Sequence, residues 1–215
     1  QYENVDAVLE LWHTISTHIK LQNFVKRIIF LEQPIHRSKA LSVSIREMVE
    51  HIPVIIDESD GTVDAFLQAK VLGYSGVSSK TCKGLYKSII NAARCSMWNK
   101  ELGEDKYFQS AEDLTCQAGL AVQQDIALIS LLGITHVERN GHHYVNGMAG
   151  AGDQEQLNFL NNHNDLYQKI KGRACTKIVD GKFSVASLRC IGFATKAFPD
   201  WLTLDDMKST LIEFQ

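Results

Sequence analysis

Several features that would place this chain in a specialised class are missing from its 215 residues. No apolar run approaches the roughly 20 residues that a membrane helix needs, and the N-terminus carries no signal-peptide pattern. Neither a G-x-G-x-x-G fingerprint nor a P-loop pattern occurs, which argues against the common glycine-rich phosphate sites. The net charge of −3 offers no general attraction to nucleic acid or to anionic membranes.

The cysteines lack the pattern of a disulfide framework or a zinc site. They are odd in number, widely spaced and without a C-x-x-C pair. The five are Cys82, Cys95, Cys116, Cys175 and Cys190. We therefore expect reduced thiols that act as small core residues in a cytoplasmic protein.

The most informative stretch is an apolar strand that runs directly into charge. Val54–Ile56 are three β-branched residues with no polar alternation, which is typical of a strand buried on both faces. Asp57 and Glu58 follow at once. A carboxylate pair at such a place is costly unless a cation uses the charge, so the pattern indicates a candidate site.

The same pattern occurs once before this stretch and once after it. The apolar run Ile28–Leu31 ends in Glu32, and Gly76–Ser79 leads into Lys80. Charged residues thus end three successive strands, and we expect the side chains to gather at one edge of a sheet. Ordinary salt bridges or helix caps at these strand ends are the alternative interpretation.

The chain alternates strands and helices at intervals of about 25 residues, which predicts parallel strands joined by right-handed crossovers. A fourth strand near Tyr107–Ser110 would deliver Glu112 and Asp113, and a fifth lies near Ile134–Val137. Polar residues at the C-terminal strand ends favour an α/β fold of the (β/α) TIM-barrel type over an open sheet. A closed barrel needs eight strands, so we expect a partial barrel of five C-terminal units, with about three strands preceding Gln1.

The pattern changes near residue 174. A helix is predicted over about 154–171, and residues 176–179 and 182–185 then flank Asp180-Gly181, a pair typical of a type I′ hairpin turn. We expect residues 1–173 to form the barrel portion and residues 174–215 to form a separate C-terminal segment. A last short helix is predicted over about 202–214.

Three short motifs resemble the barrel of the enolase superfamily, in the branch of mandelate racemase and muconate-lactonising enzymes. They are Leu31–Pro34 (LEQP), Ile56–Ser59 (IDES) and Lys80–Gly84 (KTCKG). Their order and spacing agree with the fourth, fifth and sixth strands of that barrel. Where the family often has Gly-Gly after the position of Lys83, this chain has Gly-Leu.

The resemblance implies roles for particular residues. Glu32 and Asp57 would bind Mg²⁺, and Lys80 would act as the general base. Glu58 would contact that lysine, and the segment around Val179–Lys182 is similar to the family's return toward a capping domain. A third metal carboxylate is expected upstream of Gln1.

The implied activity is that of a Mg²⁺-dependent lyase or isomerase that abstracts a proton α to a carboxylate. Acid-sugar dehydration, racemisation or epimerisation, and cycloisomerisation all stay open. We expect a small-molecule carboxylate substrate, no nucleic-acid or membrane partner, and a homo-oligomer. The alternative is a non-catalytic, truncated or degenerate barrel that acts only in binding or assembly.

Further charged side chains lie where a barrel would place groups that contact the substrate. These are Lys83, Glu112, Asp113, His136 and Glu138. A solvated loop explains the last four equally well, and Lys83 is better explained as a supporting cation or a surface residue. His136, His142 and His143 with Glu138 could form a transition-metal cluster, but two adjacent histidines do not easily face one ion.

Overall fold

A computed structural model describes residues 1–113, 118–139 and 145–204, except for the side chains of Asp113 and Arg139. The chain divides into two compact units. Unit 1 comprises residues 1–113 and 128–138, and unit 2 comprises residues 114–127 and 139–215. The expected boundary between residues 173 and 174 stays a prediction about the domains, and each unit is treated separately below.

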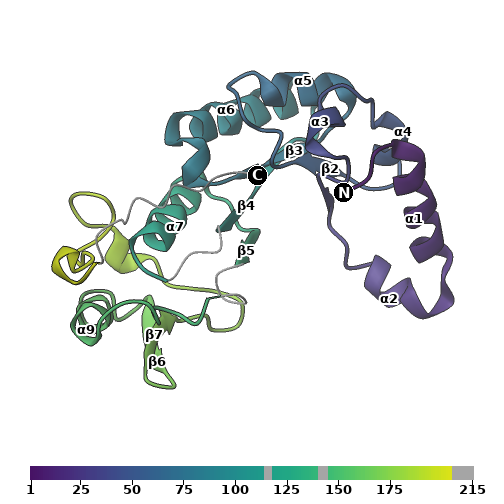
Figure 1. Cartoon of the computed structure of the whole chain (residues 1–215). Coiled ribbons are helices and arrows are strands. Elements are labelled where there is room, and N and C mark those ends of the chain that lie inside the picture. The colour runs from purple at the N-terminus through teal and green to yellow at the C-terminus, as the bar shows by residue number, and fades with distance from the viewer. Residues whose placement is uncertain (114–117, 140–144, 205–215) are drawn as a thin grey trace, which may run out of the picture. The chain divides into compact units, whose positions relative to one another are not determined.

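Unit 1 is built on a five-stranded parallel sheet that curls into a half-barrel (Figure 1). Its strands lie side by side in chain order: β1 (Leu31–Glu32), β2 (Val54–Ile56), β3 (Gly76–Ser79), β4 (Phe108–Asp113) and β5 (Val137–Arg139). Because neighbouring strands run in the same direction, their C-terminal ends meet at one edge. The predicted alternation of strands and helices is therefore confirmed, and the sheet is compatible with a partial barrel.

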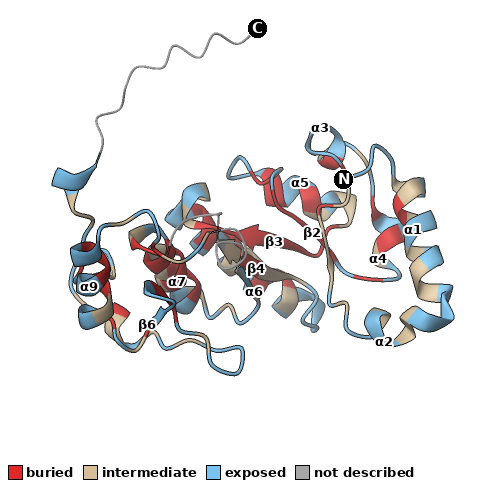
Figure 2. Cartoon of the chain, turned by 60° about the horizontal axis from the view of Figure 1, so that its bottom comes forward, coloured by how far each residue is buried: buried red, intermediate tan, exposed pale blue. Residues whose placement is uncertain are grey.

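Two inner strands of the sheet, β2 and β3, are fully buried (Figure 2). Gly76 at the start of β3 leaves room for the neighbouring strand, since a Cβ there would lie 2.6 Å from the carbonyl oxygen of Phe108. The buried run at residues 54–56 thus has the two-sided burial that its composition predicts.

The helices of unit 1 form the outer layer. Figure 1 shows α5 and α6 along the outer side of the sheet. The elements before the second strand are α1 (Val5–Thr17), α2 (Gln22–Val25), α3 (Arg37–Ala40) and α4 (Arg46–Val49). The later ones are α5 (Ala65–Leu72), which ends at Gly73, and α6 (Leu85–Leu102). Helix α7 (Leu120–Leu132) runs across the division between the units.

Unit 2 holds a helix and an antiparallel hairpin. These are α9 (Asp153–Asn162), β6 (Tyr167–Ile170) and β7 (Arg173–Thr176). The helix predicted to reach residue 171 ends nine residues earlier, because the polar run that begins at His163 favours a turn over helix. A hairpin turn follows at Lys171 and Gly172, both at positive φ.

The Asp180-Gly181 turn predicted within residues 176–185 is confirmed, but its flanking segments do not form the strands of a hairpin. Asp180 and Gly181 do form a turn with positive φ at both residues, but only one isolated antiparallel bridge, Val179 to Lys182, flanks it. The hairpin with paired strands is formed by β6 and β7, which lie just before it in the sequence. The helix predicted over 202–214 falls almost entirely outside the described residues. No helix in the described part of the chain is long and apolar enough to cross a membrane.

Candidate metal centre

Four strands of unit 1 deliver charged side chains to the same edge of the sheet. Glu32 is the last residue of β1, Asp57 follows β2, and Lys80 follows β3. Glu112 lies next to the end of β4. Register brings the last two together, because Ser79 pairs with Ala111 and each is followed by one of these residues.

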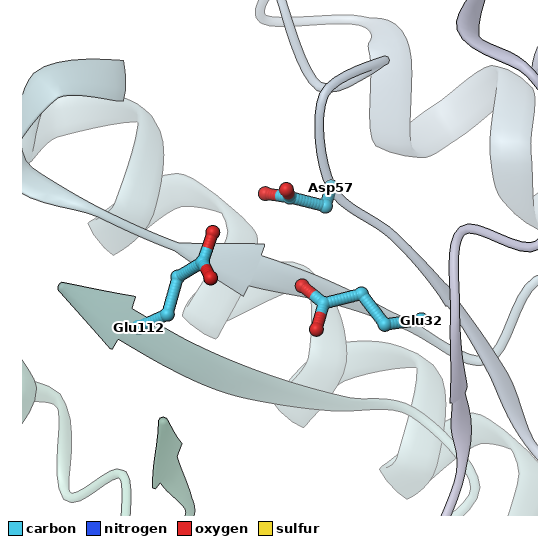
Figure 3. A group of neighbouring side chains, drawn as sticks. All are labelled: Glu32, Asp57 and Glu112. Atoms are coloured by element: carbon cyan, nitrogen blue, oxygen red, sulfur yellow. The ribbon is translucent and has the colours of Figure 1, made fainter. Parts of the chain in front are cut away.

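Three carboxylates converge at this edge. One oxygen from each of Glu32, Asp57 and Glu112 lies within 4.8 Å of the other two (Figure 3). Asp57 is only 6% exposed. Oε1 of Glu32 is buried and has no hydrogen-bond partner among the described residues. Hard oxygen ligands at this spacing, one of them unpaired, could hold a divalent metal ion.

Two lysines neutralise part of this negative charge. Lys80 Nζ lies 2.8 Å from Oδ1 and 2.9 Å from Oδ2 of Asp57, and it also forms an ion pair with Glu112. Lys83 Nζ lies 2.7 Å from Asp57 Oδ1, and it donates to the backbone oxygens of Asp57 and Ser78, each at 2.8 Å. Lys83 is thus tied to the backbone, whereas Lys80 contacts side-chain carboxylates.

The pKa shifts at this site follow from burial and from the unequal sharing of the lysines. Burial, with the charges of Asp57 and Glu138, raises the pKa of Glu32. Burial also raises the pKa of Asp57, but Lys83 and Lys80 outweigh it and leave that pKa lowered. Burial lowers the pKa of Lys83 against the opposing charge of Asp57. Of the two acids, Glu32 is therefore less well compensated than Asp57.

Gln33 ties the first two carboxylates together. Its backbone N–H donates to the carbonyl of Ile55 at 2.8 Å, and its side-chain Oε1 accepts from the amides of Asp57 (2.9 Å) and Ser59 (2.8 Å). It is 1% exposed and has a φ of +26°, an unfavourable value for a non-glycine residue. One buried amide side chain therefore fixes the turn that carries Asp57 beside the end of β1.

A second ion pair supports the same turn from α6. Lys87 Nζ lies 2.9 Å from Asp60 Oδ2 and also donates to the Asp60 backbone oxygen. The Asp60 amide in turn donates to the Asp57 carbonyl at 2.9 Å. Burial raises the pKa of Asp60, with Lys87 opposing that shift. Sequence reasoning missed this pair and Gln33, because nothing in their local pattern separates them from ordinary helix and loop residues.

The other predicted site residues are spread around the unit. Glu58 is exposed, and its side chain accepts a hydrogen bond from Gln1 Nε2 at 2.9 Å. The carboxylate partners of Lys80 are Asp57 and Glu112. Glu138 is exposed on β5, and its charge reaches Glu32. The side chain of Asp113 lies outside the described part of the chain.

His136 lies at the opposite end of its strand from the carboxylates. It precedes β5, where its ring packs edge-on against Phe30 with 5.0 Å between ring centroids. Its Nδ1 lies 3.1 Å from the hydroxyl of Ser110. His142 and His143 fall outside the described residues.

The sequence predicts Glu112 as a substrate contact, whereas the geometry brings it beside the two predicted metal ligands. The signal that could have found it is strand alternation, since side chains i and i+2 share a face. Phe108 contacts the ring of Phe30, and Ser110 contacts His136, whereas Gln109 bonds the backbone of Ser88 on α6. The even-numbered side chains of β4 therefore face away from the helix layer, and Glu112 belongs to that set.

No protein-family model matches the chain, and no curated protein matches it.

Proposed function

We propose that this chain carries a divalent-cation site and belongs to an enzyme of the enolase superfamily that abstracts a proton α to a carboxylate. The observation that carries the proposal is the meeting of Glu32, Asp57 and Lys80 at one edge of a parallel sheet. Had these side chains pointed to different faces, the three motifs would have been coincidental. Lyase and isomerase outcomes both follow from this first step.

The proposed ligands are Glu32, Asp57 and Glu112, and Mg²⁺ is the ion that this donor set suits. The unpartnered Oε1 of Glu32 supports the fit, because a buried carboxylate oxygen is costly unless something compensates it. When bound, the ion would act as a Lewis acid toward a substrate carboxylate.

Lys80 is the residue we assign to proton transfer. Once its ammonium has lost a proton to solvent, the neutral amine of Lys80 would accept the proton as the α C–H bond breaks, while the bonding electron pair stays on the substrate. Returning the proton to the other face gives racemisation or epimerisation, and loss of a β-leaving group gives dehydration. Lys83 has a different part: three hydrogen bonds hold its ammonium, and it orients Asp57.

Cation binding is the first test. Titration of the chain with Mn²⁺, followed by electron paramagnetic resonance, should show one site, and Asp57→Asn should weaken it about tenfold or more. Asp64→Asn is the matched control, because the Asp64 side chain is 72% exposed and lies outside the cluster. Equal affinity in both variants would remove Asp57 from the ligand set.

Proton exchange is the second test. Carboxylic acids from an acid-sugar and N-acyl amino-acid panel are incubated with the protein and Mg²⁺ in deuterated water. We expect deuterium at the α-carbon of at least one of them, lost in Lys80→Met while Mn²⁺ binding persists. Exchange that survives Lys80→Met would assign the base elsewhere.

A structural ion-pair cluster in a non-catalytic protein is the second candidate. It is favoured by one observation, that Lys80 and Lys83 already compensate Asp57 without any added ion. This candidate predicts no Mn²⁺ binding at millimolar concentration and no exchange with any acid of the panel.

A further inference from the structure

Lys80 occupies a position that a bound cation would need. Its ammonium contacts both oxygens of Asp57 and forms an ion pair with Glu112, so it bridges two of the three proposed ligands. The residue is 7% exposed, and its charge is compensated inside the cluster rather than by water. Lys83 differs, because two of its three hydrogen bonds go to backbone oxygens, which are not among the proposed ligands.

The two cations compete for the same oxygens. Oδ1 of Asp57 already accepts from both lysines, which leaves Oδ2 as the freer ligand. A Mg²⁺ ion on Oδ2 sits about 2.1 Å away, and Lys80 Nζ is 2.9 Å from the same atom. Ion and ammonium would then be at most about 5 Å apart in a buried site, where like charges repel strongly.

We propose that Lys80 is a built-in competitor of the divalent cation, which must displace its ammonium from Asp57 and Glu112 before the site becomes active. This inference rests on the proposed function and adds a regulatory element to it. Without the ion, Lys80 would stay paired with Asp57 and Glu112. With the ion, Lys80 is driven off those ligands and becomes available to substrate.

The first experiment compares Mn²⁺ affinity in the wild-type 215-residue chain, in Lys80→Met and in Lys83→Met. Competition predicts that Lys80→Met binds Mn²⁺ at least about tenfold more tightly, the equivalent of about 1.4 kcal/mol. Lys83→Met is the matched control, since it removes the same charge from the same carboxylate without bridging two ligands. An equal gain in both variants would reveal a general charge effect and would overturn the inference.

The second experiment does not depend on any variant folding. A crystal structure of the wild-type chain soaked with Mn²⁺ locates the ion by anomalous scattering. We expect Lys80 Nζ to lie beyond hydrogen-bond distance of Asp57 in that structure. Bound Mn²⁺ with the Lys80–Asp57 contact intact overturns the inference and leaves the proposed function standing.

The remaining outcomes are also decisive. Mn²⁺ binding to Lys80→Met but not to the wild type overturns the inference, because an ion that cannot displace Lys80 cannot activate the site. Absence of Mn²⁺ binding in both proteins overturns the proposed cation site and, with it, the competition.

Discussion

The buried titratable side chains of the two units are compensated in different ways. In unit 1 they form ion pairs, as Asp57 does with Lys80 and Lys83. In unit 2 the corresponding groups are bonded to backbone amides and hydroxyls. His163 is 0% exposed, its Nε2 accepts from the Lys196 amide at 2.9 Å, and its Nδ1 lies 2.9 Å from the Ser187 hydroxyl.

Asp165 in unit 2 follows the same rule. Its Oδ2 accepts from the Ser184 hydroxyl at 2.7 Å and from the Ser187 amide at 3.1 Å. Burial raises the pKa of Asp165, but the hydrogen bonds from Ser187 and Ser184 outweigh it and lower the pKa to about 2. The hydrogen bonds of His163 and Asp165 therefore hold the connecting segment at residues 184–196 in place.

The difference teaches where to look for function. Hydrogen bonds to backbone stabilise a fold, whereas a cluster of facing charges with an unpartnered oxygen costs stability unless a ligand completes it. An unpartnered oxygen alone does not mark such a site, because Oδ1 of Asp165 in unit 2 is also buried without a partner within the described chain; Glu32 differs in lying beside two further carboxylates. Sites of this kind are commonly maintained at the expense of stability.

The largest effect is expected at the ion pair that supports the cluster. Lys87→Met leaves Asp60 buried without its cation, and loss of one partner of a buried pair costs about 3–5 kcal/mol. Urea unfolding followed by tryptophan fluorescence measures this, because Trp98 lies in the core of unit 1.

Two further variants test whether the burial of the Lys87–Asp60 pair causes this loss of stability. Lys39→Met breaks the exposed pair with Glu3 and should cost less than about 1 kcal/mol. The double variant Lys87→Met with Asp60→Leu should recover most of the loss, since no charge is then left unpaired. A loss from Lys39→Met as large as that from Lys87→Met would erase the distinction between buried and exposed pairs.

An intermediate effect is expected in unit 2. His163→Ala leaves the Lys196 amide without its acceptor in a part-buried hydrogen bond, which costs about 1 kcal/mol. Amide hydrogen exchange over residues 186–197 should accelerate in this variant. Unchanged exchange there would mean that His163 does not hold this segment.

The same histidine predicts a pH dependence. Burial lowers the pKa of His163 below the ordinary 6.5, so the unfolded chain takes the proton more readily than the folded one. The stability it contributes is present above pH 6.5 and is lost as pH falls from there toward the folded pKa. Nearby charges act in both directions, as Asp165 raises this pKa and Lys196 lowers it. Unfolding at pH 7.5 and 5.5, wild type against His163→Ala, isolates this contribution.

The smallest effects should have opposite signs in the two units. Glu32→Gln should stabilise unit 1 by a few tenths to roughly 1 kcal/mol, because it removes a poorly compensated buried charge. Since burial raises the folded pKa of Glu32 above 4.5, the gain should appear as pH rises above that value. Asp165→Asn should destabilise unit 2 by roughly 1 kcal/mol through weaker hydrogen bonds. Thermal unfolding of both variants at pH 7 measures the signs, and equal signs would contradict the contrast.

Much of the charged edge of the parallel sheet in unit 1 was predictable from the local sequence pattern. The buried run at residues 54–56 specifies β2 by composition alone, and the acids and lysine that follow successive strands must meet because parallel strands share one edge. Hence Glu32, Asp57 and Lys80 could be placed together without coordinates. Their proposed roles in catalysis stay predictions.

The contacts that the sequence did not predict depend on side-chain direction or on a long separation in sequence. The choice between Glu112 and Asp113 needed the alternation of β4, which cannot be read until the strand is anchored to its neighbours. The Glu58 contact with Lys80 did not form, because successive residues leave a strand in opposite directions and Asp57 takes the inward one. Gln33 acts through backbone amides 24 and 26 residues away, a separation that no local motif encodes.

Gln33 also sets how the edge could distinguish one ion from another. Its single amide oxygen accepts from the backbone of Asp57 and Ser59, so the turn that carries Asp57 cannot leave the end of β1 without breaking these two hydrogen bonds. The backbone positions of Glu32 and Asp57 are thus held next to each other. A fixed backbone spacing would favour Mg²⁺ over Ca²⁺, because Mg²⁺ requires shorter and more regular ligand distances. A side chain outside the proposed ligand set would then limit the size of ion that the edge accepts.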